Sequence, residues 1–339
     1  MRHSMPCCEP ERAAQFRLYS SFVSALKCRS PRTLFILMTL LSVRHVTRYS
    51  YRAPVGFGEH RLMARPRDSF DQRLIAFRLD IRPEPRAVRW LHDLFGNCIT
   101  VAQFACQSEE LTFETNIVLD HDPSHAPDFT LESDAQTYPF AYDAEETPDL
   151  VRLIERQYPD PDDIVETWAR KFLPSDGVAK TGKLLMTLTS AIKESFVYET
   201  RPERGTQDPA FTLLTGRGSC RDFALLMMEA ARALGLAARF VTGYLHIPSR
   251  AAGDGLQGGG HTHAWCQIYL PGAGWVEFDP TNGIVGNRNL IRVGIARDPR
   301  QALPLSGTYI GAAEDALGMT VSVVTREIAA EPEPATLRS

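Results

Sequence analysis

The chain has 339 residues, of which 44% are hydrophobic and 23% charged, and its formal net charge is −4. This composition is typical of a globular protein long enough for two domains, and no basic excess indicates nucleic acid as a partner. The seven cysteines are odd in number and include no C-x-x-C pair, which argues against a disulfide framework and a four-cysteine zinc site. We therefore expect a reducing compartment, the cytoplasm.

An apolar segment, residues 33–43, follows three basic residues near the N-terminus. This order is typical of a signal peptide, but the segment is too short to span a bilayer and no small-residue cleavage site follows it. We favour the alternative in which residues 41–51 form the first strand of the fold, so export is the less favoured interpretation. Residues 1–40 are then expected to be a disordered extension, and Met38 is a candidate natural start.

Residues 41–122 are predicted to form a β-rich domain. Runs of alternating, β-branched and aromatic residues predict strands at 43–51, 73–81, 98–106 and 111–119. The sequence DLFGN, from Asp93 to Asn97, predicts a hairpin turn. Several short strands joined by turns favour an antiparallel sandwich or barrel. Residues 123–148 are rich in Asp, Pro, His and Ser, and we interpret them as a linker along the surface.

Residues 149–328 are predicted to form the second domain. Helices are expected at 150–158, 163–172 and 183–198, and the clearest helix begins at Cys220. Its apolar residues recur at helical spacing, namely Phe223, Leu226, Met227, Ala230 and Leu234. Ser219 and Asp222 form a capping-box signature at its start, and Gly235 is typical of a C-terminal cap.

Strands are expected to follow this helix to the end of the second domain. They lie within 236–245, 261–270, 274–283, 289–296 and 319–328, and a glycine-rich loop, 248–260, separates the first two. The strands within 289–296 and 319–328 are expected to belong to the same domain as the helices. Residues 329–339 are expected to be a disordered tail.

Cys220 is the candidate nucleophile. A helix N-terminus stabilises a thiolate through unpaired N–H groups and a partial positive charge, and a nearby imidazolium adds to this effect. Gly216 and Gly218 would let the backbone turn sharply and let a substrate approach. Taken alone, Cys220 is more simply interpreted as a core residue, because free cysteine is among the most buried residue types.

His263 and Asp279 are the candidate base and orienting carboxylate, on two consecutive predicted strands. A two-residue turn between the strands would point Asp279 to the wrong face of the sheet. An odd turn, or one bulge at Gly272 or Gly274, restores the match. Asp279 then lies opposite Trp265 and diagonal to His263, a distance that side chains bridge. We therefore predict such an irregularity.

Structural roles compete with these assignments. A lone histidine on a strand is more often a satisfied structural residue, and Asp279 before Pro280 is also a turn former. His261 competes with His263 for the role of base, although we expect it to lie in the loop. Zinc is an alternative because four side chains are acceptable ligands: Cys220, His261, His263 and Asp279. No spacing demands a metal, and we expect neither a metal nor another cofactor.

Three stretches of the sequence resemble the bacterial transglutaminase-like proteins. They are the strand-rich VRHVTRYSYRAPV, the region with Gly-x-Cys-x-Asp-Phe, and the region with His-Ala-Trp followed by Gly-Trp-x-x-Phe-Asp-Pro-Thr-Asn. The resemblance covers residues 41–328. It implies an α+β chain in which an N-terminal antiparallel β sandwich or barrel precedes a papain-like transglutaminase core. In that core a helix carrying the cysteine packs on an antiparallel sheet carrying the histidine and aspartate.

The resemblance also implies a catalytic triad. Cys220 would be the nucleophile, His263 the base and acid, and Asp279 the orienting carboxylate. Many relatives carry an apolar residue where this chain has Ser219, and the predicted helix cap makes this departure harmless.

A substrate cleft is expected around the thiol. Four residues are assigned to it: Gly218, Ser219, Trp265 and Trp275. Both tryptophans are equally compatible with a place in the core. The backbone N–H of Cys220 is the expected oxyanion donor, and Tyr198 or a residue near Lys183 is a candidate for the second donor.

The triad implies acyl transfer from an amide or peptide bond through a thioester, with a peptide or protein as the substrate. Water as the acceptor gives a peptidase or amidase, which we slightly favour, and an amine gives a transglutaminase. The alternative is a catalytically inactive binding or scaffold protein that keeps the fold. We expect neither a nucleic acid nor a membrane as a partner, and the sequence does not predict the oligomeric state.

Overall fold

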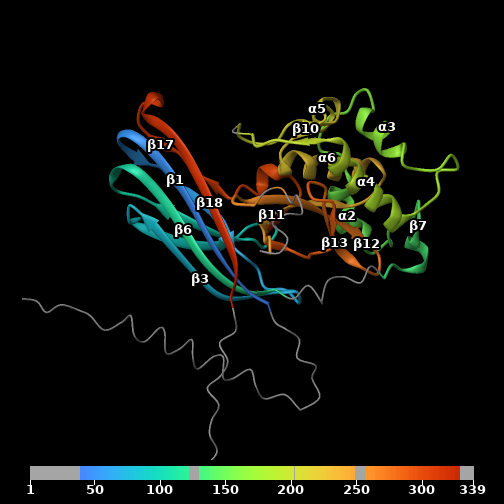
Figure 1. The fold of residues 1–339 in the computed structure, drawn as a ribbon, viewed down its shortest axis with the longest axis horizontal. Helices are drawn as coiled ribbons and strands as arrows, with labels where there is room; N and C mark the ends of the chain where they lie inside the picture. Colours follow the sequence, from blue (N-terminus) through green and yellow to red (C-terminus); the bar gives the residue numbers. More distant parts are fainter. Residues whose placement is uncertain (1–38, 122–129, 202, 249–256, 258, 329–339) are drawn as a thin grey trace, which may run out of the picture. The chain divides into compact units, whose positions relative to one another are not determined.

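Two antiparallel β sheets and a helix-covered third sheet make up the described part of the chain (Figure 1). The computed structural model describes residues 39–121, 130–201, 203–248, 257 and 259–328. The predicted N-terminal extension through residue 38, the tail 329–339 and most of the glycine-rich loop lie outside the described residues. Among the residues that are described, no helix is both long and apolar enough to cross a membrane.

The N-terminal β region consists of strands from both ends of the chain. They are β1 (Thr39–Phe57), β2 (His60–Arg65), β3 (Gln72–Arg82), β4 (Ala87–His92), β5 (Cys98–Gln103), β6 (Gln107–His121), β16 (Leu305–Ser306), β17 (Tyr309–Ile310) and β18 (Ala316–Ile328). One sheet has the order β17–β1–β6–β3, with β18 also paired to β1, and the other has the order β16–β2–β5–β4. A cluster of buried apolar side chains contains Tyr51, Val55, Phe57, Leu62, Ala64, Ala102, Leu111 and Phe113. Because it draws on both sheets, the predicted sandwich is confirmed.

The turn between β4 and β5 forms where the sequence predicts it. The Asp93 carboxylate accepts hydrogen bonds from the backbone N–H groups of Phe95 and Asn97, at 2.9 and 2.8 Å. Gly96 follows with a φ of +73°, which a glycine adopts at little cost. The side chain of Asp93 therefore closes the hairpin that DLFGN indicates.

The C-terminal strand differs from expectation. The sequence assigned it to the second domain, but β18 pairs along β1 from Leu40↔Ile328 to Tyr51↔Ala316 (Figure 1). The physical reason is that β1 is 19 residues long and would otherwise leave a row of unpaired backbone groups at its edge. The preceding strand assigned to that domain, near residue 290, does join the core sheet.

The core combines helices with a five-stranded sheet. The helices are α2 (Thr147–Ile154), α3 (Ile164–Arg170), α4 (Thr181–Ser195), α5 (Pro209–Thr215) and α6 (Cys220–Ala233). The sheet contains β11 (Ala238–Leu245), β12 (His263–Leu270), β13 (Gly274–Asp279), β14 (Ile284–Val285) and β15 (Leu290–Ala296), in the order β14–β13–β12–β11–β15. Two short pairs complete it: β7 (Thr137–Tyr138) with β8 (Ala179–Lys180), and β9 (Val197–Tyr198) with β10 (Arg217–Gly218).

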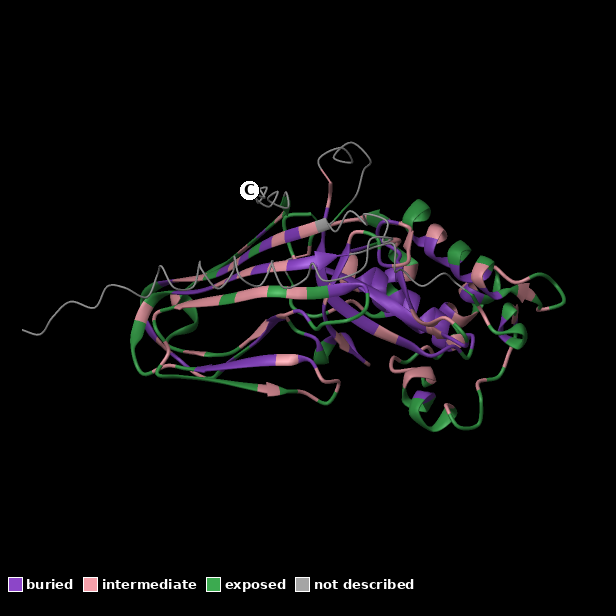
Figure 2. Ribbon diagram, turned by 90° about the horizontal axis from the view of Figure 1, so that it is seen from below, coloured by how far each residue is buried: buried purple, intermediate pink, exposed green. Residues whose placement is uncertain are grey.

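Helix α6 is buried on all sides, as the dense purple region of Figure 2 shows. Its apolar side chains pack against one face of β12, including Ala264, Cys266 and Ile268. Its polar residues are buried too, because Glu229 pairs with Arg232 at 2.8 Å and with Arg156 at 3.0 Å. The sequence predicts the apolar stripe of this helix, but not that ion pairs would allow the opposite face to be buried.

The end of α6 also follows the prediction. Gly235 has a φ of +78°, its N–H bonds to the carbonyl of Arg232, and the N–H of Leu236 bonds to that of Ala231. This pair of bonds is the Schellman arrangement, which satisfies the last carbonyls of a helix.

Residues 130–146 are more closely attached to the core than a surface linker would be. Ala135 and Tyr138 are buried, and the Thr181 hydroxyl donates to the carbonyl of Ala135 at 2.6 Å. The Tyr142 hydroxyl donates to the carbonyl of Tyr269 at 3.0 Å. These contacts arise because the segment carries apolar and aromatic side chains between its polar residues.

Buried polar contacts join the N-terminal sheets to the core. His45 on β1 bonds to the hydroxyl of Tyr244 on β11 at 3.0 Å. Arg292 on β15 binds both Glu277 on β13, at 2.6 Å, and Asp71 from the N-terminal region. The core sheet is therefore anchored to the N-terminal β region at more than one position.

The turn between β12 and β13 has three residues, 271–273. Leu270 pairs with Gly274 and Cys266 with Phe278, so the predicted odd turn is confirmed. Gly272 and Gly274 have φ values of +88° and +71°, in the left-handed region that favours glycine. A Cβ on Gly272 would lie 2.7 Å from the backbone nitrogen of Glu132, whereas one on Gly274 would meet nothing within 4 Å.

We predict that Gly272→Ala destabilises the protein more than Gly274→Ala does. Both variants force alanine into a left-handed conformation, at about 1 kcal/mol, but only Gly272→Ala adds a clash with the backbone. The extra loss is expected to be about 1–3 kcal/mol, the range for overpacking a filled site. Urea unfolding of the two variants measures the difference, and equal losses would contradict the contact with residue 132.

Candidate active site

Cys220 is the first residue of α6, and its side chain is partly exposed. The predicted capping box is present. The Asp222 carboxylate accepts hydrogen bonds from the backbone N–H of Ser219 at 2.8 Å and from its hydroxyl at 2.7 Å. The thiol is therefore held at the positive end of a 14-residue helix that is fixed at both ends.

Asp222 also holds the segment that follows β9. It is fully buried and accepts from Arg201 Nε at 2.8 Å and from the N–H of Gln207 at 2.7 Å. Burial opposes ionisation, but the hydrogen bonds from Arg201 and Ser219 outweigh it and keep the pKa of Asp222 below its usual value. Arg221 adds a bond to the carbonyl of Glu203 at 2.6 Å. No sequence spacing signals these contacts.

His263 is the first residue of β12 and is buried. Its Nε2 lies 2.8 Å from Oδ2 of Asp279, the last residue of β13. The register of the hairpin explains this contact, because its continuation places Asp279 opposite Trp265 and diagonal to His263. The structure therefore brings the two residues together in the way that the odd turn predicts.

Asp279 is both the partner of His263 and a turn former. Its Oδ1 accepts the backbone N–H of Thr281 at 3.0 Å and that of Asn282 at 3.3 Å. Its Oδ2 accepts the Asn282 side-chain amide at 2.8 Å, in addition to His263. Asp279 therefore contacts His263 and forms the turn at the same time, so the two interpretations of DPTN do not exclude one another.

The imidazole of His263 lies between the thiol and the carboxylate. Nδ1 is buried and has no hydrogen-bond partner among the described residues, and the side chain of Cys220 is close enough to interact electrostatically with the ring. Burial lowers the pKa of His263, but the charge and hydrogen bond of Asp279, together with Cys220, raise it to about 10. This arrangement favours the imidazolium form at neutral pH. By contrast His261 is exposed, in the segment before β12.

Tyr198 at the end of β9 is close enough to interact electrostatically with Cys220. Burial and the nearby thiol raise the pKa of Tyr198 to about 12, so its hydroxyl remains a hydrogen-bond donor at neutral pH. The sequence offered Tyr198 only as one of two candidates for this position.

The other residues assigned to the cleft lie in different surroundings. Gly218 and Ser219 are buried beneath the start of α6. Trp265 is fully buried and stacks on His263, with ring centroids 5.9 Å apart. Trp275 lies at the opposite end of β13 from Asp279, where the Arg239 guanidinium is 3.9 Å from its ring centre. The structure does not bring Trp275 to the triad, because successive residues along the strand carry it away.

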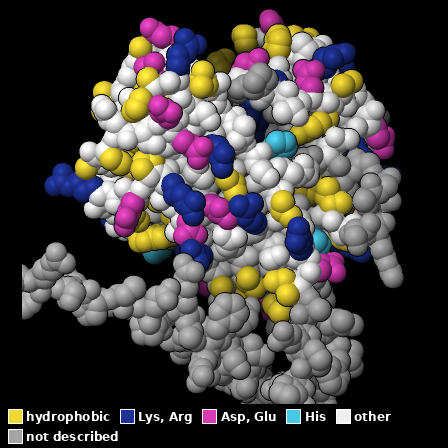
Figure 3. Space-filling model, turned by 60° about the vertical axis from the view of Figure 1, so that its left-hand side comes forward, with side chains coloured by type: hydrophobic (Ala, Val, Ile, Leu, Met, Phe, Trp, Pro, Cys, Tyr) yellow, Lys and Arg dark blue, Asp and Glu magenta, His cyan; other side chains and the backbone are white. Residues whose placement is uncertain are grey.

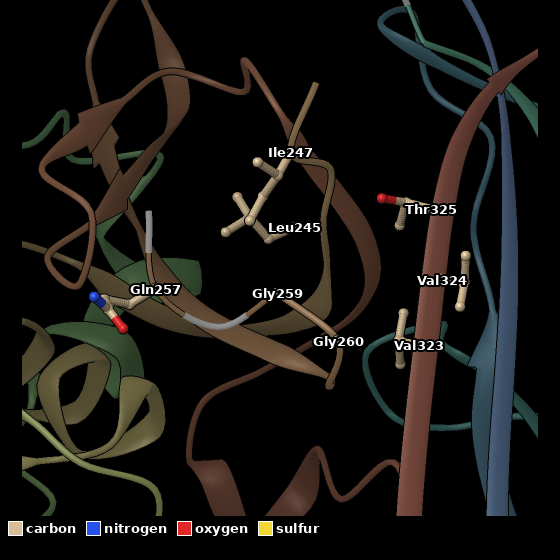
Figure 4. A pocket seen from close by; sticks show the side chains of 8 residues that line it. All are labelled: Leu245, Ile247, Gln257, Gly259, Gly260, Val323, Val324 and Thr325. Carbon is tan, nitrogen blue, oxygen red and sulfur yellow. The ribbon is translucent and has the colours of Figure 1, made fainter. Parts of the chain in front are cut away.

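Two pockets are lined by described residues of this part of the chain. One, of about 410 Å³, is lined by residues of the segment held by Asp222, including Thr200 and Arg201. The other, of about 510 Å³, lies between Leu245 and Ile247 on one side and Val323–Thr325 of β18 on the other (Figure 4). Among the described residues, no group of three or more His, Cys, Asp or Glu side chains is arranged to hold a metal ion.

The comparisons with known proteins agree with this architecture. Residues 170–280 match the model of the transglutaminase-like superfamily. Residues 41–120 match the model of the bacterial transglutaminase-like N-terminal region, so the two models match the β-rich region and the core in the expected order.

Related chains extend over most of the sequence. An uncharacterized protein of Mycobacterium tuberculosis is 29% identical over 293 residues, which cover 84% of this chain and 92% of the relative. An uncharacterized protein of Mycobacterium leprae is 29% identical over 300 residues, which cover 84% of this chain and 99% of the relative. Both relatives are bacterial and span the N-terminal β region as well as the core.

A solved structure shares the fold. The crystal structure of a Cytophaga hutchinsonii protein, provisionally described as a cysteine protease, matches with a TM-score of 0.63 and 16% sequence identity. The match covers 88% of this chain and 93% of that chain. The papain-like α+β fold expected from the sequence is confirmed, and it is a fold of thiol-dependent enzymes.

We predict that ionisation of His263 makes the stability of the protein depend on pH. The folded pKa, about 10, exceeds the ordinary value of 6.5, so the stabilisation is complete below pH 6.5 and is lost as the pH rises through 10. The difference in unfolding free energy from His263→Gln should shrink over this window, by at most about 1.4 kcal/mol per pH unit.

The measurement is urea unfolding from pH 6 to pH 10. Both proteins should carry Cys220→Ser, so that ionisation of the thiol does not contribute. Replacement of the exposed His92 by Gln is the matched control for the loss of an imidazole. A difference for His263→Gln that stays flat across this pH range would contradict the pairing with Asp279.

Proposed function

We propose that this protein is a thiol-dependent acyl-transfer enzyme that cleaves amide or peptide bonds through a thioester on Cys220. The observation that carries the proposal is the position of His263, whose Nε2 bonds to Asp279 and whose ring is close enough to Cys220 to interact with it electrostatically. A nucleophile, a base and a group that orients the base are the components that covalent acyl transfer requires.

The first half of the reaction transfers the acyl group to the enzyme. With His263 in the imidazolium form, Nδ1 already holds the proton, and the thiolate Sγ of Cys220 attacks the carbonyl carbon of the substrate. The C–N bond then breaks, and the leaving amine takes the proton from Nδ1, which leaves the imidazole neutral. Asp279 keeps the proton of Nε2 in place throughout, which leaves Nδ1 free to exchange the reacting proton.

The second half releases the acyl group. An acceptor, water or an amine, gives a proton to Nδ1 and attacks the thioester carbon. The C–S bond breaks, Cys220 leaves as the thiolate, and the product is a carboxylic acid or a new amide. We favour water, because an amine acceptor needs a binding site of its own whereas water does not.

The developing oxyanion requires hydrogen-bond donors. We assign the backbone N–H of Cys220, at the start of α6, and the hydroxyl of Tyr198, which is protonated at neutral pH. Removal of one such donor typically costs about 10²–10³-fold in kcat.

The substrate we propose is a peptide or protein. On the face shown in Figure 3, basic and acidic side chains are interspersed, which fits such a substrate better than a nucleic acid. We keep the cytoplasm as the proposed location, and fractionation of cells that express the protein tests it. Recovery in the membrane or exported fraction would contradict it.

A catalytically inactive scaffold that keeps the fold is the alternative, and thiol labelling separates the two. We predict that iodoacetamide modifies Cys220 at least tenfold faster than Cys106 at pH 7, because an imidazolium lies beside it. Cys106 is exposed and serves as the internal control. Cys266 should react slowest, because burial raises its thiol pKa well above the ordinary value. Equal rates for Cys220 and Cys106 would favour the scaffold.

The decisive experiment offers glutamine-containing peptides to the enzyme, with and without a primary amine, and identifies the products by mass spectrometry. We predict cleavage or deamidation by the wild type and none by Cys220→Ser. Tyr198→Phe should retain the products but lower kcat by about 10²-fold, and still be alkylated at Cys220. Cross-linked products that form only when the amine is present would show that the enzyme transfers the acyl group to an amine and not to water. If no peptide gave any product, the result would argue against the proposal.

A further inference from the structure

We propose that Asn282 is a positioning residue, which orients the Asp279 carboxylate toward His263 and ties it to the segment before β12. The inference rests on the proposed function but concerns a residue outside the triad. Asn282 is buried and follows Asp279 by three positions, in a turn that the sequence presents only as DPTN.

The hydrogen bonds of Asp279 show why its orientation depends on Asn282. Backbone N–H groups occupy Oδ1, and these fix that oxygen as long as the turn exists. Oδ2, which faces His263, has one other donor, the side-chain amide of Asn282 at 2.8 Å. Both oxygens turn together about the Cβ–Cγ bond, so the amide adds to the contacts of Oδ1 and supplies the second donor that holds Oδ2 toward His263.

The side chain of Asn282 is itself held by two hydrogen bonds to the main chain of Gln257. Its Oδ1 accepts the backbone N–H of Gln257 at 2.7 Å, and its Nδ2 donates to the carbonyl of Gln257 at 3.2 Å. Rotating the amide by 180° would place Nδ2 against the N–H of Gln257, and Oδ1 against the Gln257 carbonyl and Oδ2 of Asp279. The network therefore admits one orientation. Nδ2 thereby uses both hydrogens, one on Gln257 and one on Asp279, and also lies 3.4 Å from Nε2 of His263.

Through its own contacts, Asn282 links His263 and Asp279 to two elements outside the hairpin. Lys193 on α4 donates to the backbone carbonyl of Asn282 at 2.7 Å. Gln257, whose side chain lies across the larger pocket from Val323–Thr325 (Figure 4), enters only through its main chain. Asn282 thus acts on catalysis through Asp279, and we expect it not to touch the substrate.

The test combines turnover with two readouts that need no substrate. These are the pH dependence of Cys220 alkylation and the NMR titration of His263. Asn282→Ala should lower kcat about tenfold with KM unchanged, because an interaction made in the transition state is weakened. It should slow alkylation of Cys220 at pH 7 by a similar factor and lower the pKa of His263 by about one unit, because the carboxylate is no longer held against the ring.

Asn282→Asp gives a sharper outcome, because it keeps the shape of the side chain. At low pH the introduced carboxyl is protonated and can donate to Oδ2 as the amide does. As the pH rises it ionises beside Asp279 and repels it, so activity relative to wild type should fall with pH. The titratable groups around this position include His263, which bonds to Asp279, and Lys193, which bonds to the main chain of Asn282. Tyr198 and Cys266 also interact electrostatically with Asp279.

Three control variants separate positioning from stability. Thr281→Val lies in the same turn and removes a buried hydroxyl that has no partner among the described residues, so it should leave every readout unchanged. Gln257→Ala keeps both main-chain contacts and should also leave the readouts unchanged. Gln257→Pro removes the backbone N–H, so it should change the same readouts as Asn282→Ala, by a smaller amount. Thermal unfolding of each variant shows whether it is folded.

The outcomes distinguish this inference from the proposed function. If Asn282→Ala is folded but leaves the alkylation profile and the His263 titration unchanged, Asn282 is only structural and the inference is overturned. If it shifts the titration of His263 while the wild type cleaves no peptide, the positioning role stands and the proposed function fails. A flat ratio of Asn282→Asp to wild-type activity across pH would also overturn the inference.

Discussion

The hydrogen bond between two buried side chains, His263 and Asp279, is the interaction on which the rest of the site depends. Burying two ionisable groups is costly unless the remaining hydrogen-bonding capacity of both is used. Here the carboxylate accepts from the main chain of the following turn, from an amide and from the imidazole. The three-residue turn at 271–273 supplies the register, and DPTN supplies the donors. Neither the turn nor the DPTN donors alone would be sufficient to hold the carboxylate against the imidazole.

Helix α6 meets a similar requirement at both ends. At its start the buried Asp222 gathers donors from Ser219, Arg201 and the main chain of Gln207. Near its end Glu229 and Arg232 neutralise one another within the core. A helix fastened in this way has little freedom to slide or rotate, so Cys220 keeps its position relative to a histidine that comes from a separate strand.

The sequence was most informative where one local rule decides the structure. Helical spacing and a capping signature located the start of α6, and the parity of a turn determined whether Asp279 could reach His263. Prediction was less successful where partners are far apart along the chain. The Arg201–Asp222 pair spans 21 positions, and the contact of Asn282 with Gln257 spans 25. Trp275 was misplaced because a conspicuous aromatic residue near a motif says nothing about its distance from the site.

The pairing of β18 with β1 has a consequence for how the protein is made. The strand at residues 316–328 emerges from the ribosome after the entire core, although the edge it covers belongs to the first strand described. Until then, the growing chain carries a long hydrogen-bonding edge that neighbouring nascent chains could join. Synthesis interrupted between residues 300 and 315 would leave Cys220, His263 and Asp279 in place beside an unfinished sheet. Selection on the last strand would then act on the yield of usable protein, and not on the chemistry of the site.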